Sequence, residues 1–157
     1  MHTFYACSSI IVSGATGSGK TRWTFNVLKN INQMFEGEPV SKILYCYGIY
    51  QPLFDIIKKE ITSLTFFEGV PSAQQIERFA RDKTHKLIIL DDLMSEVSGS
   101  AEAEKLFTRG THHLGLSVIY LVQNLLYQNK HARTISLNSQ YIVLFRNFRD
   151  GSQVLCL

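Results

Sequence analysis

The chain has 157 residues, of which 45% are hydrophobic and 18% are charged, so it can form one globular domain with a substantial apolar core. Its formal net charge of +3 allows a nucleic-acid partner without requiring one. We expect a soluble intracellular protein with free thiols, because a membrane span, a signal-peptide pattern and zinc-site cysteine spacing are all missing from the sequence.

Short apolar runs alternate with segments of helical pattern along the chain. The runs are continuous and rich in Ile, Val, Leu, Tyr and Phe, which is typical of strands buried on both faces of a parallel sheet. Their alternation with helices predicts one three-layer α/β domain over residues 1–157, with a mainly parallel sheet and right-handed crossovers. In chain order the runs are 9–14, 42–48, 64–69, 86–92, 116–124 and 141–145.

The first run leads into a stretch that matches G-x-x-x-x-G-K-[ST] at every fixed position. Because the stretch follows a strand and opens a helix, it predicts the phosphate-binding loop of a P-loop NTPase. Glycines let backbone N–H groups converge on phosphate oxygens, while Lys20 can reach the β- and γ-phosphates of ATP and the Thr21 hydroxyl can ligate Mg²⁺. The residues expected to cradle the nucleotide are Gly14, Ala15, Thr16, Gly17, Ser18, Gly19, Lys20 and Thr21.

Helical patterns follow the loop and recur later in the chain. Residues 20–35 place apolar side chains on one helix face. Residues 72–81 begin with Ser72 after Pro71, which predicts Ser72 as the N-cap of a helix. The stretch 93–104 looks flexible but acidic, which argues against the phosphate-clamping lid of a small-molecule kinase.

Two polar strand ends complete the expected site. Asp91 and Asp92 follow an apolar run, at the sheet edge where ligands of open α/β sheets bind. We expect Asp91 to hold Mg²⁺ opposite Thr21, and Asp92 to orient or polarise the attacking water. Gln123 ends the next run and would sense the γ-phosphate if an additional strand separates the phosphate-loop strand from the acidic strand, which predicts the strand order 5-1-4-3-2. A solvated turn at the acidic pair and an ordinary loop start at Gln123 are the alternatives.

With these motifs placed, the chain resembles the genome-packaging ATPases of the FtsK–HerA superfamily, of the poxvirus-like type found in adintoviruses and Polinton (Maverick) elements. The resemblance covers most of the chain and rests on IIVSGATGSGKT, ILYCYGIYQPLFD, FFEGVPS, LIILDDLMSE, LFTRGTHHLGLSVIYLVQNL and RTISLNSQYIVLFRNFRD. It implies ATP hydrolysis that drives translocation of double-stranded DNA into a viral capsid. It also implies a homo-oligomeric ring, expected to be a hexamer, with capsid proteins as partners in a virion, an assembly site, or the host nucleus or cytoplasm.

The resemblance suggests Arg109 as an arginine finger that reaches the γ-phosphate of a neighbouring subunit. The alternative is a surface arginine at a helix end, and Arg133, Arg146 and Arg149 are rival fingers. His112 and His113 invite a metal interpretation, but adjacent side chains diverge on a helix and no third ligand stands at a suitable spacing.

Other features leave alternatives open. The family pattern continues past NFRD with at least one further helix, so we expect a domain truncated at its C-terminus. The alternatives to the motor are a catalytically inactive, nucleotide-binding remnant of an integrated viral element and a small-molecule kinase. The aromatic residues of 45–54 fit core packing or base stacking, and the basic cluster 130–133 fits DNA backbone contacts or a solvated face. The chain lacks the GTPase motif NKxD, which favours ATP over GTP.

Overall fold

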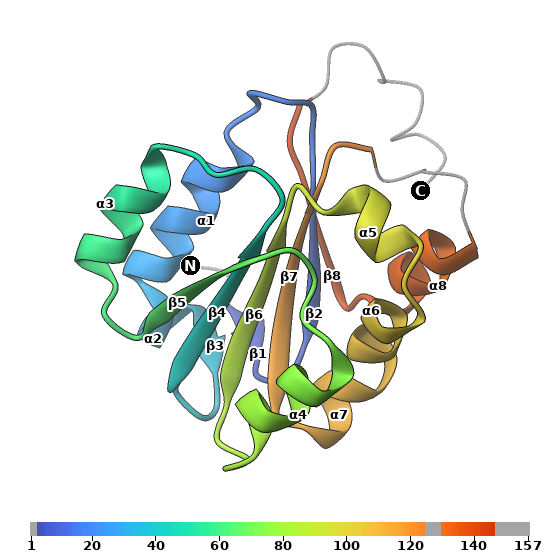
Figure 1. Cartoon of the computed structure of the whole chain (residues 1–157). Coiled ribbons are helices and arrows are strands. Elements are labelled where there is room, and N and C mark those ends of the chain that lie inside the picture. The colour runs from blue at the N-terminus through green and yellow to red at the C-terminus, as the bar shows by residue number, and fades with distance from the viewer. Residues whose placement is uncertain (1–2, 125–129, 147–157) are drawn as a thin grey trace.

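Parallel strands form the central sheet of the structure, a computed structural model that describes residues 3–124 and 130–146 (Figure 1). Helices cover both faces of the sheet, which confirms the three-layer α/β architecture. Each strand lies inside one of the apolar runs, so the expected strands are confirmed as well. They are β2 (Ser9–Ser13), β4 (Lys42–Tyr47), β5 (Leu64–Glu68), β6 (Lys86–Asp91), β7 (Leu116–Val122) and β8 (Tyr141–Leu144).

The strands of this sheet are ordered β5-β4-β6-β7-β2-β8, and all their ladders are parallel. Strand β7 separates β2, which leads into the glycine-rich loop, from β6, which ends in the acidic pair. When β2, β4, β6, β7 and β8 are numbered 1 to 5 in chain order, the sheet read from β8 to β4 has the predicted order 5-1-4-3-2. Strand β5 is added outside β4. Because parallel strands end at one edge, the loop, the acidic pair and Gln123 are brought to the same edge of the sheet.

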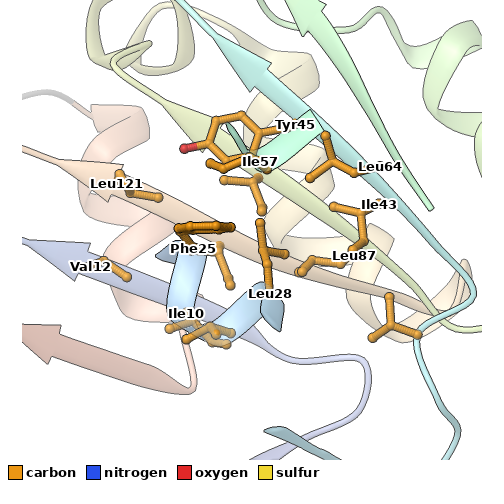
Figure 2. Packing of buried hydrophobic residues seen from close by; sticks show 14 of the residues in the cluster. Ile10, Val12, Phe25, Leu28, Ile43, Tyr45, Ile57, Leu64, Leu87 and Leu121 are labelled. Carbon is orange, nitrogen blue, oxygen red and sulfur yellow. The ribbon is translucent and has the colours of Figure 1, made fainter. Parts of the chain in front are cut away.

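Two apolar layers explain why the strand sequences are nearly continuous hydrophobic runs. One face of the sheet packs against α1 (Lys20–Lys29) and α3 (Leu53–Glu60), and Figure 2 shows the side chains that interdigitate there. The other face packs against α4 (Ala73–Ala80), α5 (Met94–Ser98), α6 (Ala101–Lys105), η1 (Leu106–Gly110) and α8 (Lys130–Asn138). Labelled members of the first layer are Ile10, Val12, Phe25, Leu28, Ile43, Tyr45, Ile57, Leu64, Leu87 and Leu121.

The helix expected over residues 20–35 is confirmed except at Asn30, where it is interrupted, and at Phe35, which lies in a strand. Helix α1 ends at Lys29, and a short α2 (Ile31–Met34) follows a break at Asn30, whose φ is −112°. The Asn30 side-chain amide donates to the Asn26 carbonyl at 2.9 Å. Asparagine side chains that bond locally to the backbone compete with helix propagation, which accounts for the break.

A small second ladder was not predicted. Phe35 begins strand β3 (Phe35–Glu36), which pairs in parallel with β1 (Phe4–Tyr5). The Phe4 ring packs against Phe35 and edge-on against Tyr141, with centroid distances of 5.8 Å and 5.0 Å. The apolar spacing that includes Phe35 therefore serves a tertiary pairing rather than a longer helix.

Helix α4 (Ala73–Ala80) begins as predicted. The Ser72 hydroxyl accepts from the Gln75 backbone N–H at 3.3 Å, while the Gln75 side chain accepts from the Ser72 N–H at 2.8 Å. This reciprocal pair is a capping box and satisfies two N–H groups that the helix leaves without partners. The assignment of Ser72 as N-cap is therefore confirmed.

The connection between β6 and β7 is helical, including the stretch 93–104 that looks flexible from sequence. It runs down the sheet face from the carboxyl edge to the amino edge (Figure 1). Helix α8 packs against the same connection. The elements are α5 (Met94–Ser98), α6 (Ala101–Lys105), the π-helical turn η1 (Leu106–Gly110), α7 (Thr111–His113) and α8 (Lys130–Asn138).

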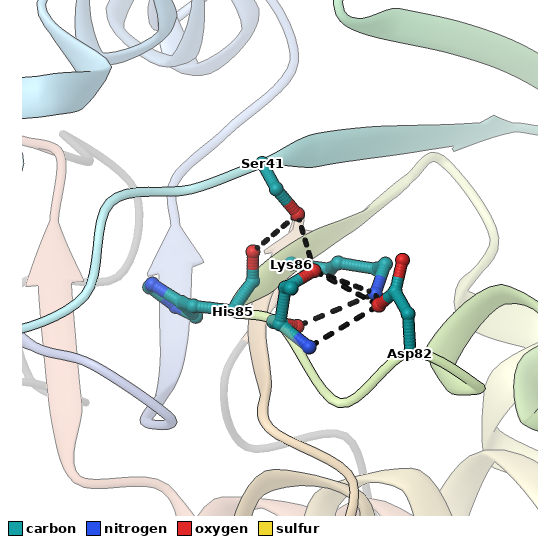
Figure 3. A network of polar contacts seen from close by, with 5 residues as sticks. Ser41, Asp82, His85 and Lys86 are labelled. Atoms are coloured by element: carbon teal, nitrogen blue, oxygen red, sulfur yellow. Dashed lines mark hydrogen bonds and ion pairs between the residues drawn. The ribbon is translucent and has the colours of Figure 1, made fainter.

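A polar network closes the amino edge of the sheet, opposite the glycine-rich loop (Figure 3). Lys86 is fully buried, and its ammonium forms an ion pair with Asp82, whose side chain is 53% exposed. The ammonium also donates to the Thr84 hydroxyl at 3.0 Å. Ser41 joins the network by donating to the His85 carbonyl at 3.0 Å. Hydrogen bonds from Lys86 and Thr84 lower the pKa of Asp82 to about 2.

Replacing Asp82 by asparagine should destabilise the fold, because the buried Lys86 ammonium would lose its counter-charge. The pKa of Asp82 in the folded state lies below its ordinary value of 3.8. Its contribution to the stability of the fold is therefore fully present above pH 3.8 and is lost as the pH falls toward 2. Urea unfolding should be measured at about pH 5 and about pH 2.5. The free energy of unfolding should fall less between these two pH values in Asp82→Asn than in the wild type. Lys86→Met is the matched control, since it removes the buried charge itself. An equal acid response in wild type and Asp82→Asn would contradict the assigned role.

Free thiols are present at Cys7 and Cys46, and burial raises the pKa of Cys46 to about 12. Cys156 lies outside the described residues. Within residues 3–124 and 130–146, no helix is long and apolar enough to cross a membrane.

Candidate nucleotide-binding site

The glycine-rich loop joins the end of β2 to the start of α1, as its motif predicts. The Gly14 N–H donates to the Val122 carbonyl of β7 at 3.1 Å, which ties the loop to the neighbouring strand. Gly17 and Gly19 have φ values of 77° and 98°, a backbone region that favours glycine. Helix α1 then begins at Lys20, so its N-terminal N–H groups and positive dipole end face the loop.

Gly14 allows a close approach at the base of the loop. A Cβ atom there would lie 2.6 Å from Phe145 Cβ and 2.7 Å from Ser18 Oγ, too close for any side chain. Phe145 follows β8, and its N–H donates to the Ser13 carbonyl at 2.8 Å. Its ring also packs edge-on against Trp23 of α1 at 6.4 Å. The loop is therefore supported from behind by a residue more than a hundred positions away in the chain.

Lys20 lies over the loop. Its ammonium donates to the carbonyl oxygens of Gly14 and Ala15, at 2.6 Å and 3.0 Å. Partial burial lowers the pKa of Lys20, and the nearby charges of Asp91 and Asp92 oppose that shift. A positive charge is thus held at the loop, facing the two carboxylates.

Asp91 and Thr21 lie in direct contact. Thr21 Oγ1 donates to Asp91 Oδ2 at 3.3 Å, and the Tyr45 hydroxyl donates to the same oxygen at 2.7 Å. Burial raises the pKa of Asp91, and the two donated hydrogen bonds offset part of the rise. Burial and the adjacent Asp91 charge raise the pKa of Tyr45 well above its ordinary value, so its hydroxyl stays protonated.

Asp92 and Gln123 also lie side by side. The Gln123 amide donates to Asp92 Oδ1 at 3.4 Å, a long hydrogen bond between the ends of β6 and β7. Asp92 has φ 56°, in the left-handed region that aspartate tolerates better than most residues. Gly48 makes room for this turn, because a Cβ at Gly48 would lie 2.2 Å from the Asp92 carbonyl oxygen. The sequence pattern alone does not identify Gly48.

A cavity of about 490 Å³ opens between the loop and the acidic pair. It brings together most of the predicted site residues, including Lys20, Thr21, Asp91, Asp92 and Gln123. Four further lining residues were missed from the sequence, although two of them follow β4, the strand expected beside the acidic strand. These are Arg22, Gln51, Leu53 and Leu121.

Arg109 does not line this cavity. It is exposed on η1 and borders another cavity of about 630 Å³, together with Glu77 and Glu102. Its neighbour Gly110 lies beside Leu116, at the amino end of β7. The glycine-rich loop lies at the carboxyl edge of the sheet, so any contact of Arg109 with a nucleotide would be made at the site of another chain.

The rival arginines occupy different places. Arg146 is exposed just beyond β8 at the carboxyl edge, and Arg133 is exposed on α8. Arg149 lies outside the described residues. His112 and His113 both belong to α7, where His113 is exposed.

The aromatic residues after the second run serve mainly as packing. Tyr45 and Phe54 are fully buried, with ring centroids 5.1 Å apart. Tyr50 is half exposed, and its hydroxyl donates to Asp55 Oδ1 at 2.7 Å. Of the two expected roles, core packing is therefore the one that Tyr45 and Phe54 have.

Several solved structures share this fold. A solved ATPase domain superposes with a TM-score of 0.62 at 11% identity, covering 95% of this chain and 73% of that one. The genome-packaging NTPase B204 of Sulfolobus turreted icosahedral virus 2, solved with ATP-gammaS, gives 0.56 at 15% identity and covers 96% and 81%. The flagellar accessory protein FlaH of Methanocaldococcus jannaschii gives 0.60 at 14% identity and covers 90% and 72%. Identities this low show a common fold alone.

Sequence comparison assigns the family. No curated protein sequence matches the chain. Residues 6–146 match the family described as Poxvirus A32 protein, and this range includes the glycine-rich loop, the acidic pair and Gln123. The chain therefore belongs to the Poxvirus A32 protein family, a viral packaging ATPase family.

Proposed function

We propose that the chain hydrolyses ATP and that this hydrolysis drives double-stranded DNA into a viral capsid. The observation that carries the proposal is the meeting of Thr21 and Asp91, 3.3 Å apart at the wall of the cavity, in a chain of the Poxvirus A32 protein family. The likeness to B204, which is named a genome-packaging NTPase, supports the same interpretation.

The residues at this wall fit a hydrated magnesium ion. Thr21 offers a hydroxyl oxygen and Asp91 a carboxylate oxygen, the hard donors that Mg²⁺ takes in sites shared with nucleotide phosphates. No cysteine or histidine stands among the described residues that line the cavity. Mg²⁺ bound there would neutralise charge that develops on the phosphoryl oxygens.

Each further side chain has a proposed role. The Lys20 ammonium exchanges its bonds to the Gly14 and Ala15 carbonyls for bonds to phosphate oxygens. Asp92 orients and polarises the attacking water. Gln123 senses the γ-phosphate, and its contact with Asp92 couples the two strand ends. The backbone N–H groups of residues 14–21 hold the remaining phosphate oxygens.

The proposed working form is a ring of identical chains around DNA, a hexamer by family resemblance. An arginine from the next subunit then supplies positive charge to the transferring phosphoryl group. Arg109 is the proposed finger, because it is exposed and lies away from the cavity of its own chain. Arg133 and Arg146 are the alternatives within the described residues.

The test is steady-state ATP hydrolysis by the purified chain, with and without double-stranded DNA, at several protein concentrations. We expect turnover that DNA stimulates and that rises more than linearly with protein concentration, since the sites are shared between subunits. Nucleotide binding without turnover under every condition would favour the inactive remnant. Turnover that needs a small-molecule acceptor instead of DNA would favour a kinase.

A further inference from the structure

Tyr45 contacts the candidate metal ligand directly. Its hydroxyl donates to Asp91 Oδ2 at 2.7 Å, the oxygen to which Thr21 Oγ1 also donates. The Tyr45 ring is 0% exposed and packs against Phe54 and Phe66, with centroids 5.1 Å away in both cases. The packing therefore holds the hydroxyl against one oxygen of the Asp91 carboxylate.

The register of two strands explains why a tyrosine serves here. Tyr45 of β4 pairs with Ile89 of β6, and Asp91 lies two residues further along β6 on the same face. Two strand residues span about 6.6 Å, which is close to the length of a tyrosine side chain. A phenylalanine at this position would fill the same space without offering a donor to the carboxylate.

We infer that Tyr45 is a positioning residue that holds the Asp91 carboxylate in one orientation and thereby strengthens Mg²⁺ binding with the nucleotide. Side chains that hydrogen-bond to a metal ligand fix its geometry, so less freedom is lost when the metal binds. A hydroxyl that merely satisfies its own hydrogen bond would leave metal affinity unchanged. The inference rests on the proposed function, because it takes Asp91 as a metal ligand.

The test compares two tyrosine-to-phenylalanine variants of the full chain. Tyr45→Phe keeps the buried ring and removes the hydroxyl. Tyr47→Phe is the matched control, since Tyr47 lies on the same strand and face and packs in the same aromatic cluster. Its hydroxyl makes no hydrogen bond to any residue within 3–124 and 130–146. Binding of mant-ATP is titrated in EDTA and then over a series of Mg²⁺ concentrations, beside thermal unfolding.

We expect Tyr45→Phe to raise the half-saturating Mg²⁺ concentration roughly 10-fold. Its EDTA binding and thermal midpoint should stay near those of the wild type, and Tyr47→Phe should match the wild type throughout. An unchanged half-saturating Mg²⁺ concentration in Tyr45→Phe overturns the inference. Mant-ATP binding that is weakened equally in EDTA and in Mg²⁺ also overturns it, because that result would indicate a packing role alone. If mant-ATP binding by the wild type does not depend on Mg²⁺, the proposed metal site is wrong, and so is the inference about Tyr45.

Discussion

Replacing Lys20 by alanine should lower the turnover number for ATP by about 10²- to 10³-fold and weaken nucleotide binding. The Lys20 ammonium bonds to the Gly14 and Ala15 carbonyls, so its positive charge is already held at the loop where phosphates would lie. Removing it takes away a preorganised donor aimed at charge that develops during phosphoryl transfer. Steady-state hydrolysis gives the turnover number, and mant-ATP titration gives the affinity.

Lys29→Ala is the control for this loss of charge. Lys29 also belongs to α1, but it is half exposed and forms a surface ion pair with Glu60 at 3.2 Å. Exposed pairs of this kind contribute little to stability. Turnover in Lys29→Ala should therefore equal that of the wild type, and wild-type turnover in Lys20→Ala would refute the phosphate-loop assignment.

Replacing Asp92 by asparagine should stop hydrolysis while ATP binding persists. Loss of a general base costs about 10²- to 10⁴-fold in rate. The change preserves local structure, because asparagine tolerates the φ of 56° at this position as aspartate does. It also keeps an Oδ1 atom that can accept from the Gln123 amide. The expected result is a turnover number at least about 100-fold lower, with mant-ATP affinity near that of the wild type.

Asp55→Asn provides the same chemical change away from the cavity. Asp55 is exposed on α3 and accepts a hydrogen bond from Tyr50, so we expect no effect on turnover. If Asp92→Asn still hydrolyses ATP at the wild-type rate, another group activates the water. Gln51, which also lines the cavity, would then be the next residue to test.

Much of the fold could be predicted from local sequence patterns. The apolar runs predicted the strands because strands covered on both faces need continuous hydrophobic sequence. Ser72 as N-cap was predictable because capping depends on neighbouring residues alone. The strand order followed from one polar strand end, Gln123, and the structure has that order with β5 added at the edge. The helix over residues 20–35 was predicted too long, because Phe35 pairs with a distant strand.

The candidate site likewise combines features that local sequence predicts with contacts that only the tertiary structure creates. The sequence by itself determined the glycine-rich loop and the acidic pair as the candidate site, because glycine, lysine, threonine and aspartate stand there at fixed local spacings. Only the tertiary structure decided that Tyr45 reaches Asp91, that Gly48 admits the Asp92 turn and that Arg109 lies at the opposite edge of the sheet. These contacts depend on the register between strands and on the path of the helices that connect them. Register and path are set by packing between residues far apart in the chain, which no local spacing encodes.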